Sequence, residues 1–400
     1  MYKAASLFSL LFLVSACQAN NEENNVDVVE SPQNNESNND DNNSDEAVDP
    51  INNSDNNQNE AENTQEENNI NDEDTLTNTN IEDWNVETLA DQLSTPWTIT
   101  LSEDAEVIHL TSREGHILEI TEGEEPEQIE MRTSDPIVEA GEGGLLGFEL
   151  LEEEEAFLYY TYEGGETGLS NRIVRAERTE DGWEETDILL DEIEGAQIHN
   201  GGRLALGPDD MLYATTGDAD EPDWSQDEGR LAGSILRMTT EGEIPDDNPL
   251  DDSYVYSYGH RNPQGLAWNT EEELYSSEHG AQALDEVNII EPGNNYGWPV
   301  IEGSEEEEGM ETPALHSGET TWAPSGAAFW EDEFITVGLR GESVYVFNEE
   351  EEEMHITYEG EGRLRDVVVH DNALYIITNN TDGRGNPGEN DDRLLRLTRD

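Results

Sequence analysis

The sequence has very little positive charge. Lys3 is the only lysine, and the 16 arginines stand against 97 acidic residues, so the 400-residue chain carries a formal net charge of −80. Nucleic acids and anionic lipid surfaces both require basic patches on a protein that binds them directly. The composition therefore excludes both classes of direct partner.

Such an excess of one charge also bears on the surroundings of the protein. Like charges repel strongly in dilute buffer, whereas the Debye length falls to about 3 Å in molar salt. We therefore predict a halophilic protein that works in a saline exterior. The alternative is an ordinary acidic secreted protein.

Cysteine is nearly absent too. Cys17 is the only one, which excludes an intramolecular disulfide. It follows Lys3 and the apolar run "LFSLLFLVSA", a secretory signal too short to span a bilayer as a mature helix. The ending "LVSAC" resembles the bacterial lipoprotein box. We expect residues 1–17 to be a signal that ends at a lipidated Cys17, which implies an extracytoplasmic protein whose only membrane contact is its lipid anchor. The alternative is a plain signal peptide cut nearby.

Aromatic residues are missing from position 18 to position 83, where Asn, Asp, Glu, Gln and Ser dominate. Such a segment cannot bury enough apolar surface to offset the entropy lost on ordering it. We predict a disordered acidic linker over residues 18–82. A flexible coil of this length has an r.m.s. reach on the order of 45 Å, which would hold a folded domain clear of the membrane.

From Trp84 onward one phrase recurs: an acidic turn, a short alternating strand and a polar loop. The six copies align on one apolar position each, at spacings of 50, 54, 62, 60 and 40 residues. These positions are Ile108, Leu158, Leu212, Leu274, Phe334 and Leu374. Each period has room for about four strands. Repetition at this period, with no long helical pattern, is typical of a radial array of small antiparallel sheets.

The fold prediction is thus all-β, a six-bladed β-propeller over residues 83–400. A β-sandwich or a solenoid is the competing fold. The short last period fits if strands from both chain ends close one blade. Loops after the repeated strands would emerge on one face, and they hold unusual residues: Arg113, Gly164, Gly165, Asp218, Glu278, His279, Arg340, Asn379 and Asn380. We expect function on that face.

The loop "QIHNGGRL", residues 197–204, places His199 before Gly201, Gly202 and Arg203. Its plain interpretation is a turn in which His199 hydrogen-bonds the backbone. Imidazole titrates near neutral pH, which also suits a general base. The two glycines would let the backbone and a ligand approach closely.

Several segments together resemble the soluble quinoprotein glucose/sorbosone dehydrogenase family, and more narrowly the aldose sugar dehydrogenases that use pyrroloquinoline quinone (PQQ). They run from about Trp84 to the C-terminus in the order found in the family: "GEGGLLGFEL" (141–150), "HNGGRLALGPDDMLYATTGD" (199–218), "LAGSILRM" (231–238), "GHRNPQGLAW" (259–268), "DEVNIIEPGNNYGWP" (285–299) and "GRLRDV" (362–367). The resemblance implies a six-bladed propeller, in agreement with the period.

The resemblance also implies an activity. An aldose would be oxidised to its lactone, with hydride passing to PQQ, His199 as the base and an external acceptor taking the electrons. Arg261 and Asn262 in "GHRNPQG" would lie at the quinone.

PQQ is a tricarboxylate, and guanidinium groups grip carboxylates through paired hydrogen bonds. The resemblance assigns Arg363 and Arg365 to the carboxylates of PQQ. Some members also hold PQQ with a lysine, which this chain lacks at that position, and Arg340 is the nearest residue that could replace it. Glu142 occupies an amide position of the glucose-oxidising members and is predicted to contact the cofactor, where a carboxylate would repel PQQ unless it were protonated or metal-bound. The alternative for each arginine is structural pairing with the abundant acids.

Calcium is the second cofactor that the resemblance implies. Ca²⁺ prefers six to eight oxygen ligands, including carboxylates and backbone carbonyls. The carbonyls of Gly280 and Ala281 would bind the ion that also touches PQQ, and a second, structural ion would take Asp285, Glu286 and Tyr296. Without the resemblance, Asp285 and Glu286 are ordinary solvated acids.

Two other functions stay open at this point. One is a non-catalytic cell-surface propeller that binds sugar or protein, which requires the arginines to pair internally. The other is a calcium-dependent lactone or ester hydrolase, which requires Asp285, Glu286 and His199 to converge on one ion.

Overall fold

The computed structural model describes residues 75–349 and 351–399. These residues form antiparallel sheets, and their only helices are two short 3₁₀ turns, η1 (Ile81–Asp83) and η2 (Pro222–Gln226). The all-β prediction is therefore confirmed. The expected signal, Cys17 and the linker up to residue 74 lie outside the described residues. Within the described ranges, no helix combines the length and the apolar character needed to cross a membrane.

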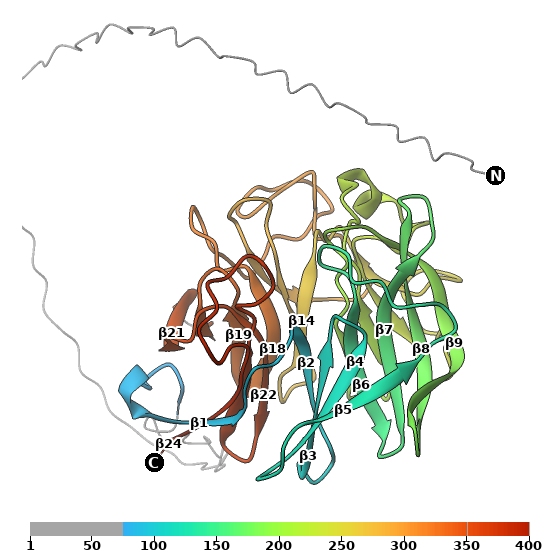
Figure 1. Cartoon of the computed structure of the whole chain (residues 1–400). Coiled ribbons are helices and arrows are strands. Elements are labelled where there is room, and N and C mark those ends of the chain that lie inside the picture. The colour runs from blue at the N-terminus through green and yellow to red at the C-terminus, as the bar shows by residue number, and fades with distance from the viewer. Residues whose placement is uncertain (1–74, 350, 400) are drawn as a thin grey trace, which may run out of the picture. The chain divides into compact units, whose positions relative to one another are not determined.

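The strands assort into four-stranded units (Figure 1). The first two units are β2 (Pro96–Leu101), β3 (Val107–Ser112), β4 (His116–Thr121), β5 (Glu127–Arg132), and β6 (Leu145–Glu152), β7 (Glu155–Glu163), β8 (Leu169–Thr179), β9 (Gly182–Gly195). A short parallel pairing of β5 with β9 joins them into one eight-stranded sheet.

The remaining strands make four separate sheets. Three of them follow the chain order: β10 (Leu204–Leu206), β11 (Leu212–Thr215), β12 (Ser234–Met238), β13 (Val255–Tyr258); β14 (Pro263–Trp268), β15 (Leu274–Glu278), β16 (Glu286–Ile290), β17 (Leu315–His316); and β18 (Pro324–Trp330), β19 (Glu333–Gly338), β20 (Ser343–Asn348), β21 (Glu353–Glu359). The last has the order β1 (Trp84–Ala90), β24 (Leu394–Arg399), β23 (Ala373–Thr378), β22 (Leu364–His370).

The first strands of successive units contact one another in a closed circle. The contacts run from β2 to β6, β10, β14, β18 and β22, and β22 returns to contact β2. Sheets arranged radially around a ring of inner strands are the arrangement of a β-propeller. The loops at one end of these inner strands therefore converge on a common axis.

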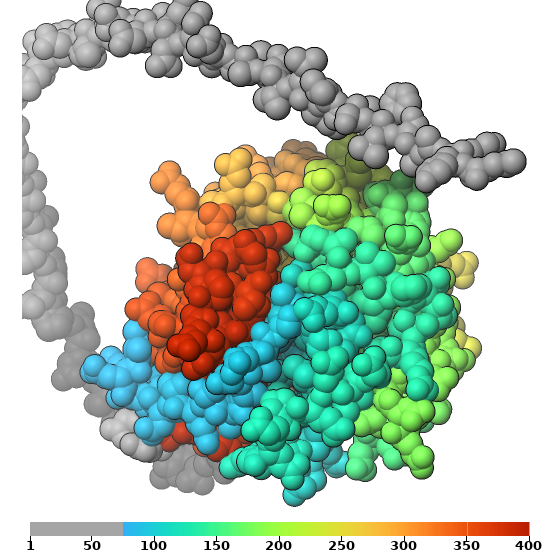
Figure 2. Space-filling view, viewed as in Figure 1, coloured from blue at the N-terminus to red at the C-terminus, as the bar shows by residue number. Residues whose placement is uncertain are grey.

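The repeat found in the sequence corresponds to a repeated place in this ring. Its six aligned positions, from Ile108 in β3 to Leu374 in β23, all fall in the second strand of their unit. The short last period has the predicted cause. The sheet of β22 and β23 is completed by β24 and by β1, which pairs antiparallel with β24 from Trp84 opposite Arg399. In Figure 2 the N-terminal part of the domain lies directly against the C-terminal strands.

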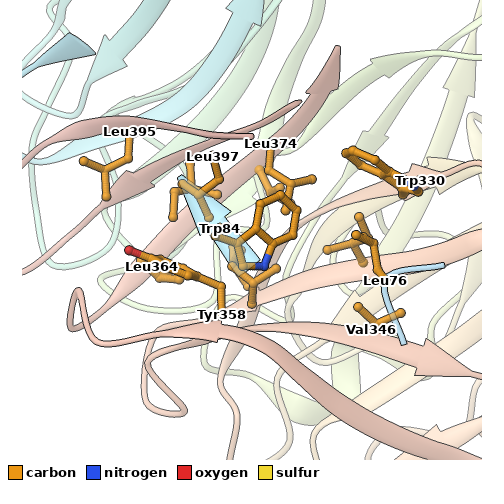
Figure 3. Close-up of a cluster of buried hydrophobic side chains, with 14 residues drawn as sticks. Leu76, Trp84, Trp330, Val346, Tyr358, Leu364, Leu374, Leu395 and Leu397 are labelled. Carbon is orange, nitrogen blue, oxygen red and sulfur yellow. The ribbon is translucent and has the colours of Figure 1, made fainter. Parts of the chain in front are cut away.

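Apolar side chains between neighbouring sheets form the core. The largest cluster lies between the β18–β21 sheet and the sheet that both chain ends complete, and Figure 3 shows Trp84, Leu76 and Leu397 within it. Leu76 is fully buried, and the carboxylate of Glu333 accepts hydrogen bonds from the backbone N–H groups of Leu76 and Thr77. Burying a leucine side chain contributes roughly 1.5–3 kcal/mol. Residues 75–82, assigned to the linker from sequence, thus pack on the domain.

Candidate functional site

His199 lies in the loop between β9 and β10 and has a fixed ring orientation. Its Nδ1 is 2.7 Å from Oδ1 of Asp218, a fully buried residue just after β11. Asp218 also accepts hydrogen bonds from the indole Nε1 of Trp298 at 2.9 Å and from the backbone N–H of Asp220 at 2.9 Å. A carboxylate only accepts hydrogen bonds, so Nδ1 of His199 carries the proton. In the neutral imidazole, Nε2 is then the proton acceptor.

The backbone of His199 is also fixed. Its φ angle of +58° lies in the left-handed region, which costs a non-glycine residue of order 1–3 kcal/mol and is found mainly where the surroundings enforce it. The backbone N–H donates to Oε2 of Glu142 at 3.0 Å, and the carbonyl accepts from Ala219 at 3.2 Å. A Cβ on Gly217 would come within 2.0 Å of the same carbonyl, so only glycine fits there. The loop thus forms the predicted turn, and its close contacts fix the position of the His199 backbone.

The Arg261–Asn262 pair joins this loop, as predicted. The carbonyl of Arg261 accepts a hydrogen bond from the Asp218 N–H at 2.8 Å, and Oδ1 of Asn262 accepts one from the Gly201 N–H at 3.1 Å. The Arg261 guanidinium lies 5.3 Å from the ring centre of Trp298. Its Nη1 donates to the carbonyl of His279, while its buried Nε has no partner among the described residues.

Arg363 and Arg365 both contact Asn379, but only Arg363 forms an ion pair. Arg363 pairs with Asp382, whose side chain is only 3% exposed, at 2.8 Å. Arg365 is buried, and its hydrogen-bond partners are the neutral oxygens of Asn379, Gln264 and Ser325. Burial, together with the nearby charges of Arg113 and Arg363, lowers the pKa of Arg365 to about 9.

Arg365 is thus a buried cation without a carboxylate among the described residues. A buried unpaired charge is strongly unfavourable, whereas an anion delivered to it would offset that cost. Structural pairing, the alternative interpretation from sequence, therefore holds for Arg363 and fails for Arg365.

Glu142 lies at the same site, where its carboxylate is paired with the guanidinium of Arg384. Burial alone would raise its pKa, but the hydrogen bond from the His199 N–H and the Arg384 guanidinium, 2.7 Å from Oε1, outweigh it and lower the pKa to about 2. The sequence pattern gave no sign of this partner. Arg384 comes from the loop between β23 and β24, far along the chain.

Arg340 stands apart from these residues. It is exposed, and its backbone N–H bonds to Trp322, but its side chain makes no hydrogen bond or ion pair within the described ranges. Only its neighbour Leu339 reaches the cluster, through a carbonyl that accepts from Arg363 at 2.8 Å.

The predicted calcium ligands differ in how far hydrogen bonds already engage them. Oδ2 of Asp285 accepts from Thr321 Oγ1, Trp322 N and Ala323 N, and Oδ1 accepts from the Gly280 N–H alone. The physical role of Asp285 is to pin the 280–285 loop to the 321–323 loop. No cluster of three or more His, Cys, Asp or Glu side chains suited to a metal occurs in the described part of the chain.

The other predicted ligands lie close to the site. Glu286, Tyr296 and Gly280 line a small cavity together with Arg261, Glu278 and Trp298. Burial and the charge of Glu278 raise the pKa of Glu286 to about 8. The hydroxyl of Tyr296 is already engaged with Ile289 and Glu291. By contrast, no donor in the described residues occupies the carbonyl oxygens of Gly280 and Ala281.

Further side chains complete the site that the sequence motifs outlined. Asp218 and Trp298 hold His199, Arg384 holds Glu142, and His279 has a buried Nε2 without a partner in the described residues. Burial lowers the pKa of His279 to about 4, so its ring is neutral at pH 7. Asp218 and His279 lie in the loops that follow the repeated strands. That position in the repeat is the sequence feature that could have identified them as site residues.

An anionic cofactor fits this donor set. Buried polar atoms of Arg113 (Nε), Arg261 (Nε) and His279 (Nε2) lack partners in the described structure, and Arg365 forms no ion pair there, although the charges of Asp382 and Glu142 raise its pKa. Buried polar groups normally find a partner. Such a concentration of unused donors beside one Asp–His pair suits a ligand that carries carboxylates.

The fold and the site have counterparts in known proteins. The sequence profile described as Glucose / Sorbosone dehydrogenase matches residues 93–396. The aldose sugar dehydrogenase of Escherichia coli K12 is 29% identical over 340 residues, covering 75% of this chain and 91% of the relative.

Solved structures agree with these matches. The PQQ-bound aldose sugar dehydrogenase from Streptomyces coelicolor is 37% identical, with a TM-score of 0.73 over 79% of this chain and 98% of that one. A putative oxidoreductase (glucose dehydrogenase) from Thermus thermophilus is 36% identical, with a TM-score of 0.72 over 78% and 99%. The chain belongs to the glucose/sorbosone dehydrogenase family, as its motifs predicted.

Proposed function

We propose that this protein is a PQQ- and calcium-dependent dehydrogenase that oxidises aldose sugars to lactones, with His199 as the general base. The observation that carries the proposal is Arg365, a buried guanidinium without a carboxylate, in the same cluster as the His199–Asp218 pair. The four-stranded units, counted with the eight-stranded sheet divided between β5 and β9, would be the six blades of a propeller. A PQQ-bound family member of similar fold supports the cofactor.

The residues present divide the chemistry among themselves. PQQ, when bound, supplies the electrophilic quinone that accepts hydride. Arg363 and Arg365 would hold its carboxylates, and Arg261 and Asn262 would lie at the quinone end. Nε2 of His199 takes the proton of the sugar hydroxyl, and Asp218 stabilises the imidazolium that forms, in the manner of other Asp–His pairs.

This division balances the reaction. The sugar loses one proton to His199 and one hydride, with its electron pair, to the cofactor, which leaves the lactone. An external acceptor must then reoxidise the cofactor. For calcium, the proposal centres on the carbonyls of Gly280 and Ala281, which accept no hydrogen bond among the described residues, whereas the Asp285 carboxylate already accepts four.

The competing functions lose support from the same contacts. A hydrolase would need Asp285, Glu286 and His199 around one ion, but four hydrogen bonds already tie the Asp285 carboxylate to the neighbouring loops. A pure binding propeller would need its arginines paired internally, and Arg365 pairs with no carboxylate among the described residues. Lipid anchoring at Cys17, an extracytoplasmic location and a saline habitat remain proposals from the sequence.

The decisive test uses the purified cofactor-free protein in molar NaCl. PQQ and Ca²⁺ are added, PQQ binding is followed by absorbance, and dye reduction is followed with several aldoses. His199→Gln should still bind PQQ but turn over about 10²-fold more slowly or worse, the range for losing a general base. The matched control is His355→Gln, which replaces a partly exposed histidine of β21.

Three results would contradict the proposal. An unchanged turnover number in His199→Gln would exclude His199 as the base. Absence of quinone binding would favour a binding module. Lactone cleavage without PQQ would favour a hydrolase.

A further inference from the structure

Arg384 makes a contact that spans two units of the ring. It lies between β23 and β24, and its Nη1 is 2.7 Å from Oε1 of Glu142, which precedes β6. The sheet of β22 and β23 and the unit of β6 are not neighbours, because β2 contacts both β22 and β6 and stands between them. The Arg384 side chain therefore reaches across the end of the intervening β2–β5 unit.

The contact is one link in a continuous chain of hydrogen bonds. Oδ2 of Asp382 accepts from Arg363 at 2.8 Å, and its Oδ1 accepts from the backbone N–H of Arg384 at 2.9 Å. The Arg384 side chain then donates to Glu142, whose other oxygen accepts the backbone N–H of His199 at 3.0 Å. The chain thus links an arginine assigned to the cofactor with the backbone of the proposed base.

We propose that Arg384 is a positioning residue, a clasp that holds Glu142 ionised and thereby fixes the backbone of His199. Glu142 has no other ion-pair partner in the described part of the chain, and its carboxylate is the acceptor for the His199 N–H. A buried carboxylate that loses its cation tends toward its neutral form, which accepts hydrogen bonds more weakly. His199 would then lose the support of its left-handed backbone.

The Arg384–Glu142 ion pair is open to solvent on its arginine side. The Arg384 side chain is half exposed, at 50%, whereas the Glu142 side chain is 20% exposed. An exposed ion pair is weak and screened by salt. Opening it would free one side of the site for a ligand, and closing it would slow release. This second role rests on the proposed function, because it concerns PQQ.

The first experiment needs no cofactor. Hydrogen exchange of the peptide covering residues 196–203 is measured by mass spectrometry in the full chain without PQQ. We expect Arg384→Gln to raise its exchange rate about tenfold, the loss for one charge-assisted hydrogen bond. Arg384→Lys should restore much of the protection. Arg396→Gln, which removes a surface arginine of β24 paired with Glu87 and Glu122, should change nothing in this peptide.

Two further comparisons make the result specific. In a Glu142→Gln background, Arg384→Gln should add no further exchange, because the arginine acts through that carboxylate. A peptide covering β23 reports global unfolding; a rise confined to residues 196–203 supports the clasp, and equal rises in both peptides contradict it. Unchanged exchange in Arg384→Gln also overturns the proposal.

The loaded protein supplies the second readout. With PQQ bound, Arg384→Gln should lower kcat about tenfold at nearly unchanged KM and speed PQQ release by a similar factor. A raised KM with normal kcat and normal release would overturn the positioning role. If the wild type binds no PQQ, the proposed function fails, and the exchange experiment still decides the clasp.

Discussion

Asp218→Asn tests the part of the site on which the proposed mechanism depends most. Asp218 is fully buried and accepts three hydrogen bonds, from His199 Nδ1, the Asp220 N–H and Trp298 Nε1. All three partners are donors. An asparagine of the same shape offers one acceptor oxygen and one donor group. It can therefore satisfy only one side of this environment.

The expected loss in kcat/KM depends on how the new amide is oriented. If the amide oxygen faces His199 and Asp220, a donor is left against Trp298; if the amide turns, Nδ1 of His199 must become an acceptor and Nε2 holds the proton. The first orientation replaces a charge-assisted bond by a neutral one, and hydrogen bonds to charged groups contribute about 1.5–3 kcal/mol. We expect kcat/KM to fall by about 10- to 150-fold. The second orientation removes the base, with a loss of about 10²- to 10⁴-fold.

The assay is dye reduction by the PQQ-reconstituted protein over a range of aldose concentrations, with PQQ affinity measured separately by titration. Asp220→Asn is the matched control, since only the backbone of this exposed residue contacts Asp218. PQQ affinity should be nearly unchanged in both variants. Wild-type kcat/KM in Asp218→Asn would refute the argument that this carboxylate sets the tautomer of His199.

Three further predictions concern the charges. Arg365→Met should weaken PQQ binding about 10- to 150-fold while the melting temperature of the cofactor-free protein stays equal or rises, because a buried unpaired charge is removed; a lower melting temperature with normal PQQ affinity would show a structural role. The pKa of Glu142, about 2 when folded against 4.5 as its ordinary value, means that this carboxylate stabilises the fold above pH 4.5 and loses that effect as the pH falls toward 2. The difference in unfolding free energy between wild type and Glu142→Gln, from urea titrations, should therefore be smaller at pH 3 than at pH 6, and a constant difference would contradict the assignment. The melting temperature should rise from dilute buffer to molar NaCl, because salt screens the repulsion of a −80 chain; insensitivity to NaCl would contradict the saline interpretation.

Much of the fold was readable from the sequence, because a repeated unit leaves a repeated pattern. The six aligned apolar positions all lie in the second strand of a four-stranded unit, and the short last period arises where β1 joins β24. The start of packing was not readable. Leu76 sits in a polar stretch like those before it, and only its burial against the last two sheets distinguishes it.

The site was readable where chemistry depends on a local motif. His199, Arg261, Asn262, Arg363 and Arg365 were predicted from short segments. Hydrogen bonds tie the His199 loop to Arg261 and Asn262, and connect it to Arg363 through Glu142, Arg384 and Asp382. Arg340 and Asp285 were predicted from the same kind of match, and their roles stay predictions: the Arg340 side chain is exposed without a partner in the described residues, and the Asp285 carboxylate accepts four hydrogen bonds. A motif specifies a residue and its neighbours in sequence, and it does not specify which donors surround that residue in space.

The class of the protein follows from its residues taken in order. The charge excluded nucleic acid, the period required a ring of small sheets, and the motifs placed a histidine and scarce arginines in loops at one end of that ring. The electrostatics of the site, in contrast, depend on the folded chain. Arg384 meets Glu142 across 242 positions of sequence, and Arg365 is left without a carboxylate among the described residues although acids abound in the chain. Pairing of charges depends on distances of a few ångströms, and folding sets those distances between residues that no local pattern connects.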